Sequence, residues 1–199
     1  MTHTNPLATL SRSRPSSIAI LLALAIAVIS LCSQVQGQTP ASDRENPKLE
    51  SVRNFHRVSD SLLTSGQIYP AQIPALKQEG VDFVVNLAIA DPERNAEEPY
   101  AMMDAGLNYV NIPVSFEEPS MSDLDLFFAV MDARGERKTL VHCFANFRAS
   151  AFTFLYRVLR EGVPEEQAQR DLLAVWDEET FDNNPAWVSF IDEALATQR

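Results

Sequence analysis

The sequence predicts an α/β protein with three layers, in which a mostly parallel sheet is flanked by helices on both faces. Short apolar segments alternate with helical periodicities through residues 62–142, and this alternation is typical of right-handed βαβ units. The segment 81–88 is mainly apolar, as expected for a strand that is buried on both faces of a parallel sheet. In open sheets of this kind, ligands bind at the carboxyl ends of the strands.

Each element is predicted from its apolar spacing and from the residues that end it. Glycines follow the first three expected helices, at Gly80, Gly106 and Gly135, and glycine favours helix termination. The expected strands or extended segments are 54–58, 62–64, 81–88, 107–114 and 138–142. The expected helices are 70–79, 96–105, 122–134, 149–161, 165–176 and 186–196.

The N-terminal residues have the layout of a secretory signal peptide. Arg12 and Arg14 precede an apolar run over 18–31, and small or polar residues follow as far as Gly37. The run is shorter than the roughly 20 residues that a membrane-spanning helix needs. We therefore expect a signal peptide over 1–37 and a periplasmic or secreted protein, with an uncleaved membrane anchor as the alternative.

The rest of the chain is predicted to form a polar, flexible leader over 38–52 and one domain over 53–199. The first 37 residues contain two of the 16 basic residues and none of the 27 acidic ones, so the remainder has a formal net charge of −13. Such a domain lacks the basic surface of a nucleic-acid binder. An anionic substrate would be attracted only by a local concentration of cations.

The segment 139–150 carries the chemistry. Cys143 ends an apolar strand, and Arg148 lies in the first turn of the next helix, where the helix dipole favours an anion. With Cys32 in the signal, Cys143 is the only cysteine of the expected mature chain, which makes it a candidate nucleophile. His56, His142 and Cys143 have no metal-ligand spacing, so we expect neither a metal nor an organic cofactor.

The His-Cys-loop-Arg-x-Ser signature over residues 142–150 resembles the phosphate-binding loop of the cysteine-dependent protein tyrosine and dual-specificity phosphatases. The segments 55–58, 63–67 and 81–87 also resemble the bacterial branch of that superfamily, so the likeness covers most of the chain after the export segment. It implies a phosphatase fold of the dual-specificity type. It also implies hydrolysis of a phosphomonoester, on a phosphorylated protein or a small molecule.

The resemblance also implies roles for individual residues. Cys143 would form a phosphocysteine, and Arg148 would bind the phosphoryl oxygens. His142 and Asn86 would support the loop. The general acid is expected from Glu117 or Glu118, with Asp123 as a weaker third candidate. The residues expected to bind substrate are Phe144, Ala145, Asn146, Phe147 and Ser150.

The loop departs from the family pattern in one respect that leaves other functions open. Four residues separate Cys143 from Arg148, whereas the family has five, and Asn146 stands nearest the place of the loop glycine. Asparagine tolerates the left-handed backbone conformation better than most residues. A rhodanese-like sulfurtransferase, which has a shorter loop, is one alternative. A non-catalytic pseudophosphatase that binds an anionic partner is the other.

Overall fold

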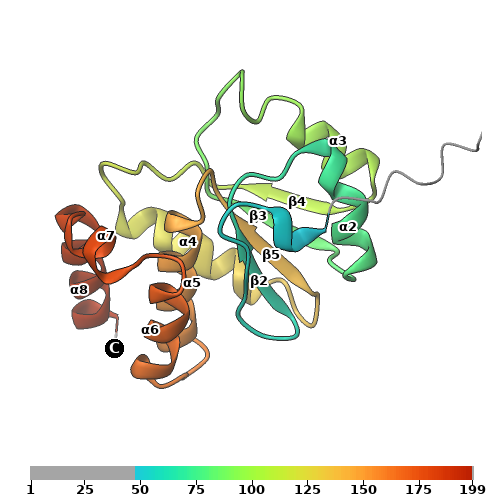
Figure 1. The fold of residues 1–199 in the computed structure, drawn as a ribbon. Helices are drawn as coiled ribbons and strands as arrows, with labels where there is room; N and C mark the ends of the chain where they lie inside the picture. The colour runs from blue at the N-terminus through green and yellow to red at the C-terminus, as the bar shows by residue number, and fades with distance from the viewer. Residues whose placement is uncertain (1–47, 199) are drawn as a thin grey trace, which may run out of the picture. The chain divides into compact units, whose positions relative to one another are not determined.

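A five-stranded mixed sheet forms the middle layer of the protein, in the order β1-β2-β5-β3-β4 (Figure 1). The structure is a computed structural model, and it describes residues 48–198. The expected signal peptide over 1–37 and most of the expected leader over 38–52 lie outside these residues. No helix within the described part of the chain is long and apolar enough to cross a membrane.

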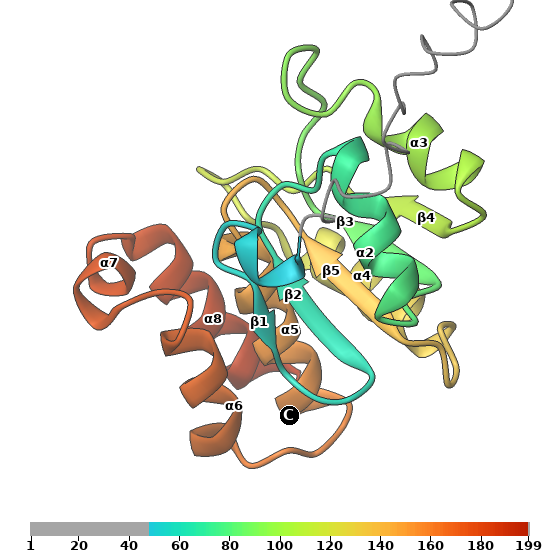
Figure 2. The same ribbon diagram turned by 45° about the vertical axis from the view of Figure 1, so that its right-hand side comes forward.

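Four strands are parallel, and the edge strand β1 pairs antiparallel with β2 (Figure 2). In register, the last residue of β5, His142, lies opposite Ser65 of β2 and Asn86 of β3. The central position of β5 therefore brings the carboxyl ends of three strands together at one edge. The strands are β1 (His56–Arg57), β2 (Leu62–Ser65), β3 (Phe83–Asn86), β4 (Asn108–Asn111) and β5 (Thr139–His142).

Helices cover both faces of the sheet (Figure 1). On one face, Val84 and Leu140 pack in a cluster with residues of α2 and α3; on the other, Val85 and Val141 pack with α4, α5, α6 and α8. Adjacent strand residues point to opposite faces, so the apolar strands supply both clusters. The helices are η2 (Leu49–Ser51), η3 (Pro70–Gln72), α2 (Ile73–Gln78), α3 (Glu98–Asp104), α4 (Met121–Asp132), α5 (Phe147–Leu159), α6 (Glu165–Leu173), α7 (Glu178–Asp182) and α8 (Pro185–Thr197).

The predicted three-layer α/β fold is confirmed, with two local differences. Sequence reasoning missed α7, whose five residues show no apolar repeat and which is started by Asp177, a side chain that accepts a hydrogen bond from the Thr180 amide. The domain also begins before residue 53, because Leu49 and Val52 are buried in the cluster that includes α2. Leu49 and Val52 are two apolar residues in an otherwise polar segment, which is why the sequence predicts a leader there.

An ionic network near the amino-terminal end of β5 joins three segments of the chain. Glu79, which follows α2, accepts hydrogen bonds from Arg57 of β1 and from Lys138, just before β5, both at 2.6 Å. The hydrogen bond from Arg57, followed by that from Lys138, lowers the pKa of Glu79 to about 2. Arg57 remains 45% exposed, so solvent screens part of this attraction.

The variant Glu79→Gln is predicted to lower the free energy of unfolding by about 1 kcal/mol at pH 7, in the range of partly exposed ion pairs. The folded-state pKa lies below the usual value, so the ionised carboxylate stabilises the fold above about pH 4.3 and this contribution is lost as the pH falls towards 2. Urea unfolding between pH 2 and pH 7 measures the effect. Glu166→Gln, which removes an exposed pair on α6, is the control. A parallel pH dependence of wild type and Glu79→Gln would contradict the assignment.

Candidate active site

The loop between β5 and α5 carries the predicted nucleophile and leads into the helix that carries the predicted oxyanion holder. Cys143 follows the last residue of β5 directly, and Arg148 is the second residue of α5. Cys143 lies at the carboxyl edge of the sheet, as the strand–loop–helix pattern predicted. The loop between them is therefore bounded by two rigid elements.

Asn146 adopts the left-handed conformation, with φ at 69°, in the position where the family pattern has glycine. Its side chain is fully buried and donates hydrogen bonds to Asn54 O, at 2.6 Å, and to Thr64 Oγ1, at 3.0 Å. Asn54 Nδ2 in turn donates to Ala145 O at 2.9 Å. The Asn146 side chain, predicted to bind substrate, thus holds the loop against the start of the domain and against β2.

Gly66 allows the end of β2 to approach this loop closely. Its amide donates to Arg53 O at 2.7 Å, and the amide of Gln67 donates to Phe144 O at 3.3 Å. A Cβ atom at Gly66 would lie 2.8 Å from Arg53 O and 3.1 Å from Phe144 O, which are both backbone atoms. Three segments of the chain therefore meet where a side chain has no room.

Most of the amide N–H groups of residues 144–149 donate no hydrogen bond within residues 48–198, and an isolated antiparallel bridge pairs Ala145 with Gly66. The amides on either side are paired: Cys143 N donates to Ser65 O at 3.3 Å, and Ser150 N donates to Asn146 O at 2.8 Å. The free amides belong to the loop and to the first turn of α5. Successive amides that end at a helix N-terminus form a typical binding site for an anion.

Arg148 is 5% exposed and is oriented by the backbone of the loop that follows β4. Its Nη1 donates to Val114 O at 2.8 Å, whereas its buried Nε has no hydrogen-bond partner in the described part of the chain. The edge of the guanidinium that bears Nε and Nη2 is therefore the edge left for a ligand. That edge has the fork geometry that binds two oxygens of one phosphoryl group.

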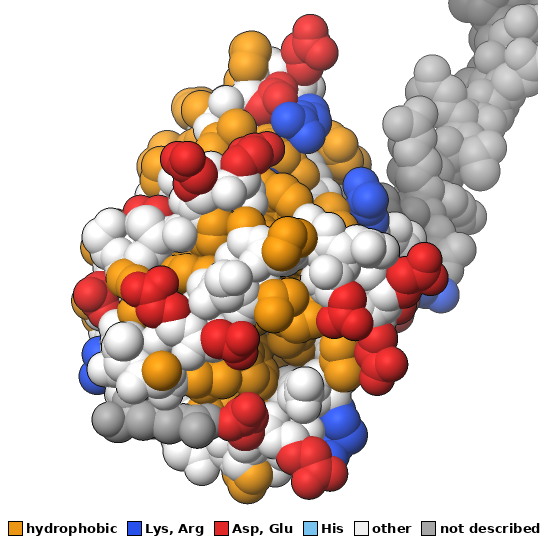
Figure 3. All heavy atoms as spheres, turned by 90° about the vertical axis from the view of Figure 1, so that its left-hand side faces the viewer, with side chains coloured by type: hydrophobic (Ala, Val, Ile, Leu, Met, Phe, Trp, Pro, Cys, Tyr) orange, Lys and Arg blue, Asp and Glu red, His pale blue; other side chains and the backbone are white. Residues whose placement is uncertain are grey.

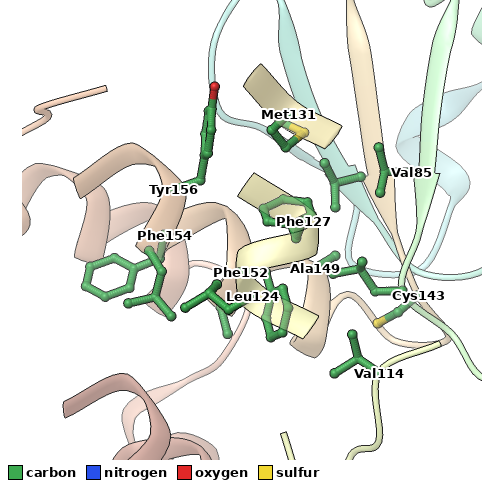
Figure 4. Close-up of a cluster of buried hydrophobic side chains, with 14 of the residues drawn as sticks. Val85, Val114, Leu124, Phe127, Met131, Cys143, Ala149, Phe152, Phe154 and Tyr156 are labelled. Carbon is green, nitrogen blue, oxygen red and sulfur yellow. The ribbon is translucent and has the colours of Figure 1, made fainter. Parts of the chain in front are cut away.

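Cys143 is a free thiol with 1% exposure and packs in the core cluster. Figure 4 shows its sulfur beside Val114, at the end of a group of buried side chains that includes Ala149. The thiol thus lies at the base of the loop rather than on the surface.

A buried polar cluster supports the loop from behind. His142 Nε2 lies 2.7 Å from Glu98 Oε1, and Gln67 Nε2 donates to Glu98 Oε2 at 2.5 Å. Asn86 donates to Tyr109 OH at 2.9 Å, and burial, together with the charge of Glu98, raises the pKa of Tyr109. The cluster ties α3 to the ends of β3 and β5.

His142 and Asn86, which were predicted to support the loop, both lie in this cluster. Asn86 Oδ1 also accepts a hydrogen bond from the Ala88 amide at 2.7 Å, which shapes the chain after β3. Glu98 was not predicted as part of the site. An acidic residue in the first turn of a helix is ordinary in sequence, so no local signal distinguished it.

The loop that was expected to supply the acid follows Val114, whose carbonyl oxygen orients Arg148. Trp187 Nε1 holds it by donating to Phe116 O at 2.9 Å. Glu117 and Glu118 are exposed, and neither forms a hydrogen bond with Cys143 or Arg148 within residues 48–198.

Asp123, the weaker candidate for the acid, has a structural role. Its amide donates to Ser120 Oγ at 3.2 Å, and Ser120 Oγ donates to Asp123 Oδ2 at 2.7 Å. Ser120 thereby caps the N-terminus of α4. The carboxylate of Asp123 is thereby engaged at the helix terminus.

Two residues predicted to bind substrate contact Trp176 instead. Ser150 Oγ donates to Phe147 O at 3.0 Å and accepts from Trp176 Nε1 at 3.1 Å. The ring centroids of Phe147 and Trp176 are 4.4 Å apart. Both side chains hold the segment after α6 against the start of α5, so neither is retained as a substrate contact.

Phe144 takes a different position, between two arginines. The Cζ atom of Arg94 lies 3.7 Å from the centroid of the Phe144 ring, and that of Arg148 lies 5.4 Å from it. The ring forms part of the wall of a cavity beside the loop. Among residues 48–198, no group of three or more His, Cys, Asp or Glu side chains is arranged to hold a metal ion.

Comparison with solved structures gives the family. The protein named "Putative phosphatase (DUF442)" from Shewanella putrefaciens CN-32 is 36% identical, covers 76% of this chain and 94% of its own, and superposes with a TM-score of 0.69. TpbA of P. aeruginosa is 20% identical over 75% of this chain and 93% of its own, with a TM-score of 0.59. Tk-PTP is 15% identical over 70% of this chain and 93% of its own, also with a TM-score of 0.59.

Scans against protein-family models and against curated proteins found no match. TpbA and Tk-PTP support the fold, and the Shewanella protein, at 36% identity along nearly its whole length, supports more than the fold. The chain belongs to the DUF442 family, which has the fold of the cysteine-dependent tyrosine and dual-specificity phosphatases.

Proposed function

We propose that this protein is a cysteine-dependent phosphatase that hydrolyses a phosphomonoester through a phosphocysteine on Cys143. One observation carries the proposal: the buried Arg148, whose Nε has no partner in the described part of the chain, lies in the first turn of α5, and the short loop before it begins at the free thiol of Cys143 and has unpaired amides. These groups are suited to a tetrahedral oxyanion with a thiolate below it. A phosphotyrosine complex is known for TpbA, which has the same fold, and supports a phosphorylated substrate.

In the first step, the phosphoryl oxygens bind to the amides of residues 144–149 and to the Nε and Nη2 edge of Arg148. The thiolate of Cys143 attacks phosphorus, so that an S–P bond forms while the P–O bond to the ester oxygen breaks. The leaving oxygen takes a proton from a general acid. Charge that develops on the equatorial oxygens is stabilised by donors that are already oriented.

In the second step, water attacks the phosphocysteine. The S–P bond breaks, inorganic phosphate is released, and the thiolate is regenerated, while the carboxylate that gave its proton accepts one from the water. We propose Glu117 or Glu118 for this carboxylate. Their loop leads directly from Val114, whose carbonyl orients Arg148.

The loop of four residues is compatible with this chemistry because Asn146 closes it in the left-handed conformation that glycine otherwise provides. Its short length also favours sulfur transfer, in which Cys143 would carry a persulfide. The likeness of the whole domain to phosphatases, including 36% identity to the Shewanella protein, supports phosphate hydrolysis instead.

Hydrolysis of an aryl phosphate by the reduced full-length chain tests the proposal. Cys143→Ser is predicted to abolish turnover, and Arg148→Lys is predicted to lower kcat/KM by roughly 100-fold or more, because lysine cannot reproduce the planar fork. Arg160→Lys, on a residue outside the site, is the matched control. Turnover no higher than that of Cys143→Ser would exclude a phosphatase, and sulfur transfer from thiosulfate to cyanide would then be measured.

The acid is identified by comparing Glu117→Gln with Glu118→Gln on two esters. Loss of the acid is predicted to slow an alkyl phosphate more than an aryl phosphate, because the poorer leaving group depends more on protonation. One variant is expected to lose about 100-fold in kcat on the alkyl ester, within the usual range for general acid catalysis. Equal, small effects of both substitutions on both esters would show that neither glutamate is the acid.

Glu98→Gln tests the support that the buried cluster gives to the loop. The substitution keeps the size of the side chain but removes the charge that faces His142, so we predict a fall in kcat of about tenfold and a changed pH profile of kcat/KM. Glu97→Gln, at the exposed neighbouring position, is the control. A loss of thermal stability with unchanged kcat and pH profile would show that Glu98 is purely structural.

A further inference from the structure

A cavity of about 330 Å³ lies beside the proposed catalytic loop. Its lining includes Arg53, Gln67, Tyr69 and Arg94, and Phe144 forms the wall nearest the loop. Phe144 is the residue that follows Cys143 directly, so an occupant of this cavity would lie next to the reacting phosphoryl group. The proposed mechanism does not use the two arginines in the lining.

Arg94 is positioned by contacts that engage its Nε and Nη2 and leave Nη1 for a ligand. Its guanidinium stacks on Phe144, and Nε and Nη2 contact Asp91 Oδ2, each at 2.7 Å. Arg94 and Arg148 both contact the Phe144 ring, with their Cζ atoms 3.7 Å and 5.4 Å from its centroid. The two Cζ atoms are therefore at most about 9 Å apart. One substrate molecule can span that separation.

Arg53 reaches the same cavity from a segment that is locked onto the loop. Its carbonyl accepts the hydrogen bond from Gly66, which packs against Phe144. Its guanidinium is exposed and forms no ion pair or hydrogen bond with another side chain within residues 48–198. Most other arginines in this part of the chain pair with carboxylates, as Arg57, Arg134, Arg157 and Arg170 do.

Acidic residues outnumber basic ones in this sequence, so a cavity lined by two arginines is unusual in it, although Arg94 also pairs with Asp91. The face in Figure 3, which is the left-hand side of Figure 1, shows more Asp and Glu side chains than Lys and Arg. A neighbouring cavity shares Tyr69 and Arg94 but is lined by Glu93, Glu97 and Glu98. Those carboxylates repel an anion, so the Arg53 side of Arg94 is the favourable one.

We infer that Arg53 and Arg94 form a second anion subsite, and that the substrate is a small molecule carrying two phosphates. The scissile phosphate would bind to the loop and Arg148, and the other would bind in the cavity on the far side of Phe144. Two guanidiniums favour a phosphate because it offers oxygens to both. The inference rests on the proposed function for the first phosphate alone, because the subsite itself binds without reacting.

Affinity measurements on the Cys143→Ser full-length chain test the subsite without any turnover. The probes are inositol 1-phosphate and inositol 1,4-bisphosphate, titrated by calorimetry at one fixed ionic strength. The bisphosphate is predicted to bind roughly tenfold more tightly, as expected for an added charge-assisted contact. Arg53→Ala and Arg94→Ala are predicted to reduce this preference towards one. Arg170→Ala removes the same charge from α6 and is predicted to leave the preference unchanged.

The outcomes separate this inference from the proposed function. A preference below twofold, or one that survives Arg53→Ala, overturns the subsite even if aryl phosphate is hydrolysed. A preference that depends on Arg53 supports the subsite even if the wild type shows no turnover. If Arg53 raises the affinity of an acidic phosphotyrosine peptide but not that of the bisphosphate, the small-molecule assignment is wrong. Ratios of kcat/KM for the two inositol phosphates on the wild type give a second reading that does not depend on folding of Cys143→Ser.

Discussion

The hydrogen bonds of Asn146 are the contacts on which the site depends. The buried side-chain amide of Asn146 joins the loop after β5 to Asn54 and Thr64, and the side chain of Asn54 donates a hydrogen bond to Ala145 O. A buried amide that loses its partners costs about 1–3 kcal/mol, so these bonds strongly favour one arrangement of the loop. With Asn146 held in the left-handed conformation, the chain turns into α5 four residues after the end of β5.

The two sides of the sheet edge support this loop by different means. On one side, Val114 O orients Arg148, and Trp187 holds the following segment through Phe116. On the other, Glu98 connects His142 with Gln67, and Gln67 also donates from its amide to Phe144 O. Gln67 therefore links the buried carboxylate to the cavity in which Arg53 and Arg94 lie. Catalysis and substrate selection would share this single support.

The order of the elements was predictable because apolar periodicity and helix-ending glycines are local signals. The position of Cys143 and Arg148 followed from the same pattern, and the left-handed tolerance of asparagine pointed to Asn146 as the residue that replaces glycine. These features depend on residues that are close in sequence. They were therefore available before the structure.

Other parts of the site depend on contacts between distant segments, and no sequence pattern encodes them. Glu98 meets His142 across 44 positions of the chain, and Arg94 meets Phe144 across 50. Ser150 was predicted to bind substrate, and its hydroxyl accepts a hydrogen bond from Trp176, 26 positions away. The buried Leu49 was assigned to the leader because a single apolar residue among polar ones carries little signal.

We propose that the short loop binds a phosphoryl group through its amides and Arg148. Titration of ¹⁵N-labelled full-length chain with inorganic phosphate, followed by amide NMR, tests it most directly. We predict saturable shifts concentrated in the amides of residues 144–149, and their loss in Arg148→Lys. Shifts that are absent, that fall outside this loop, or that persist unchanged in Arg148→Lys would contradict the account.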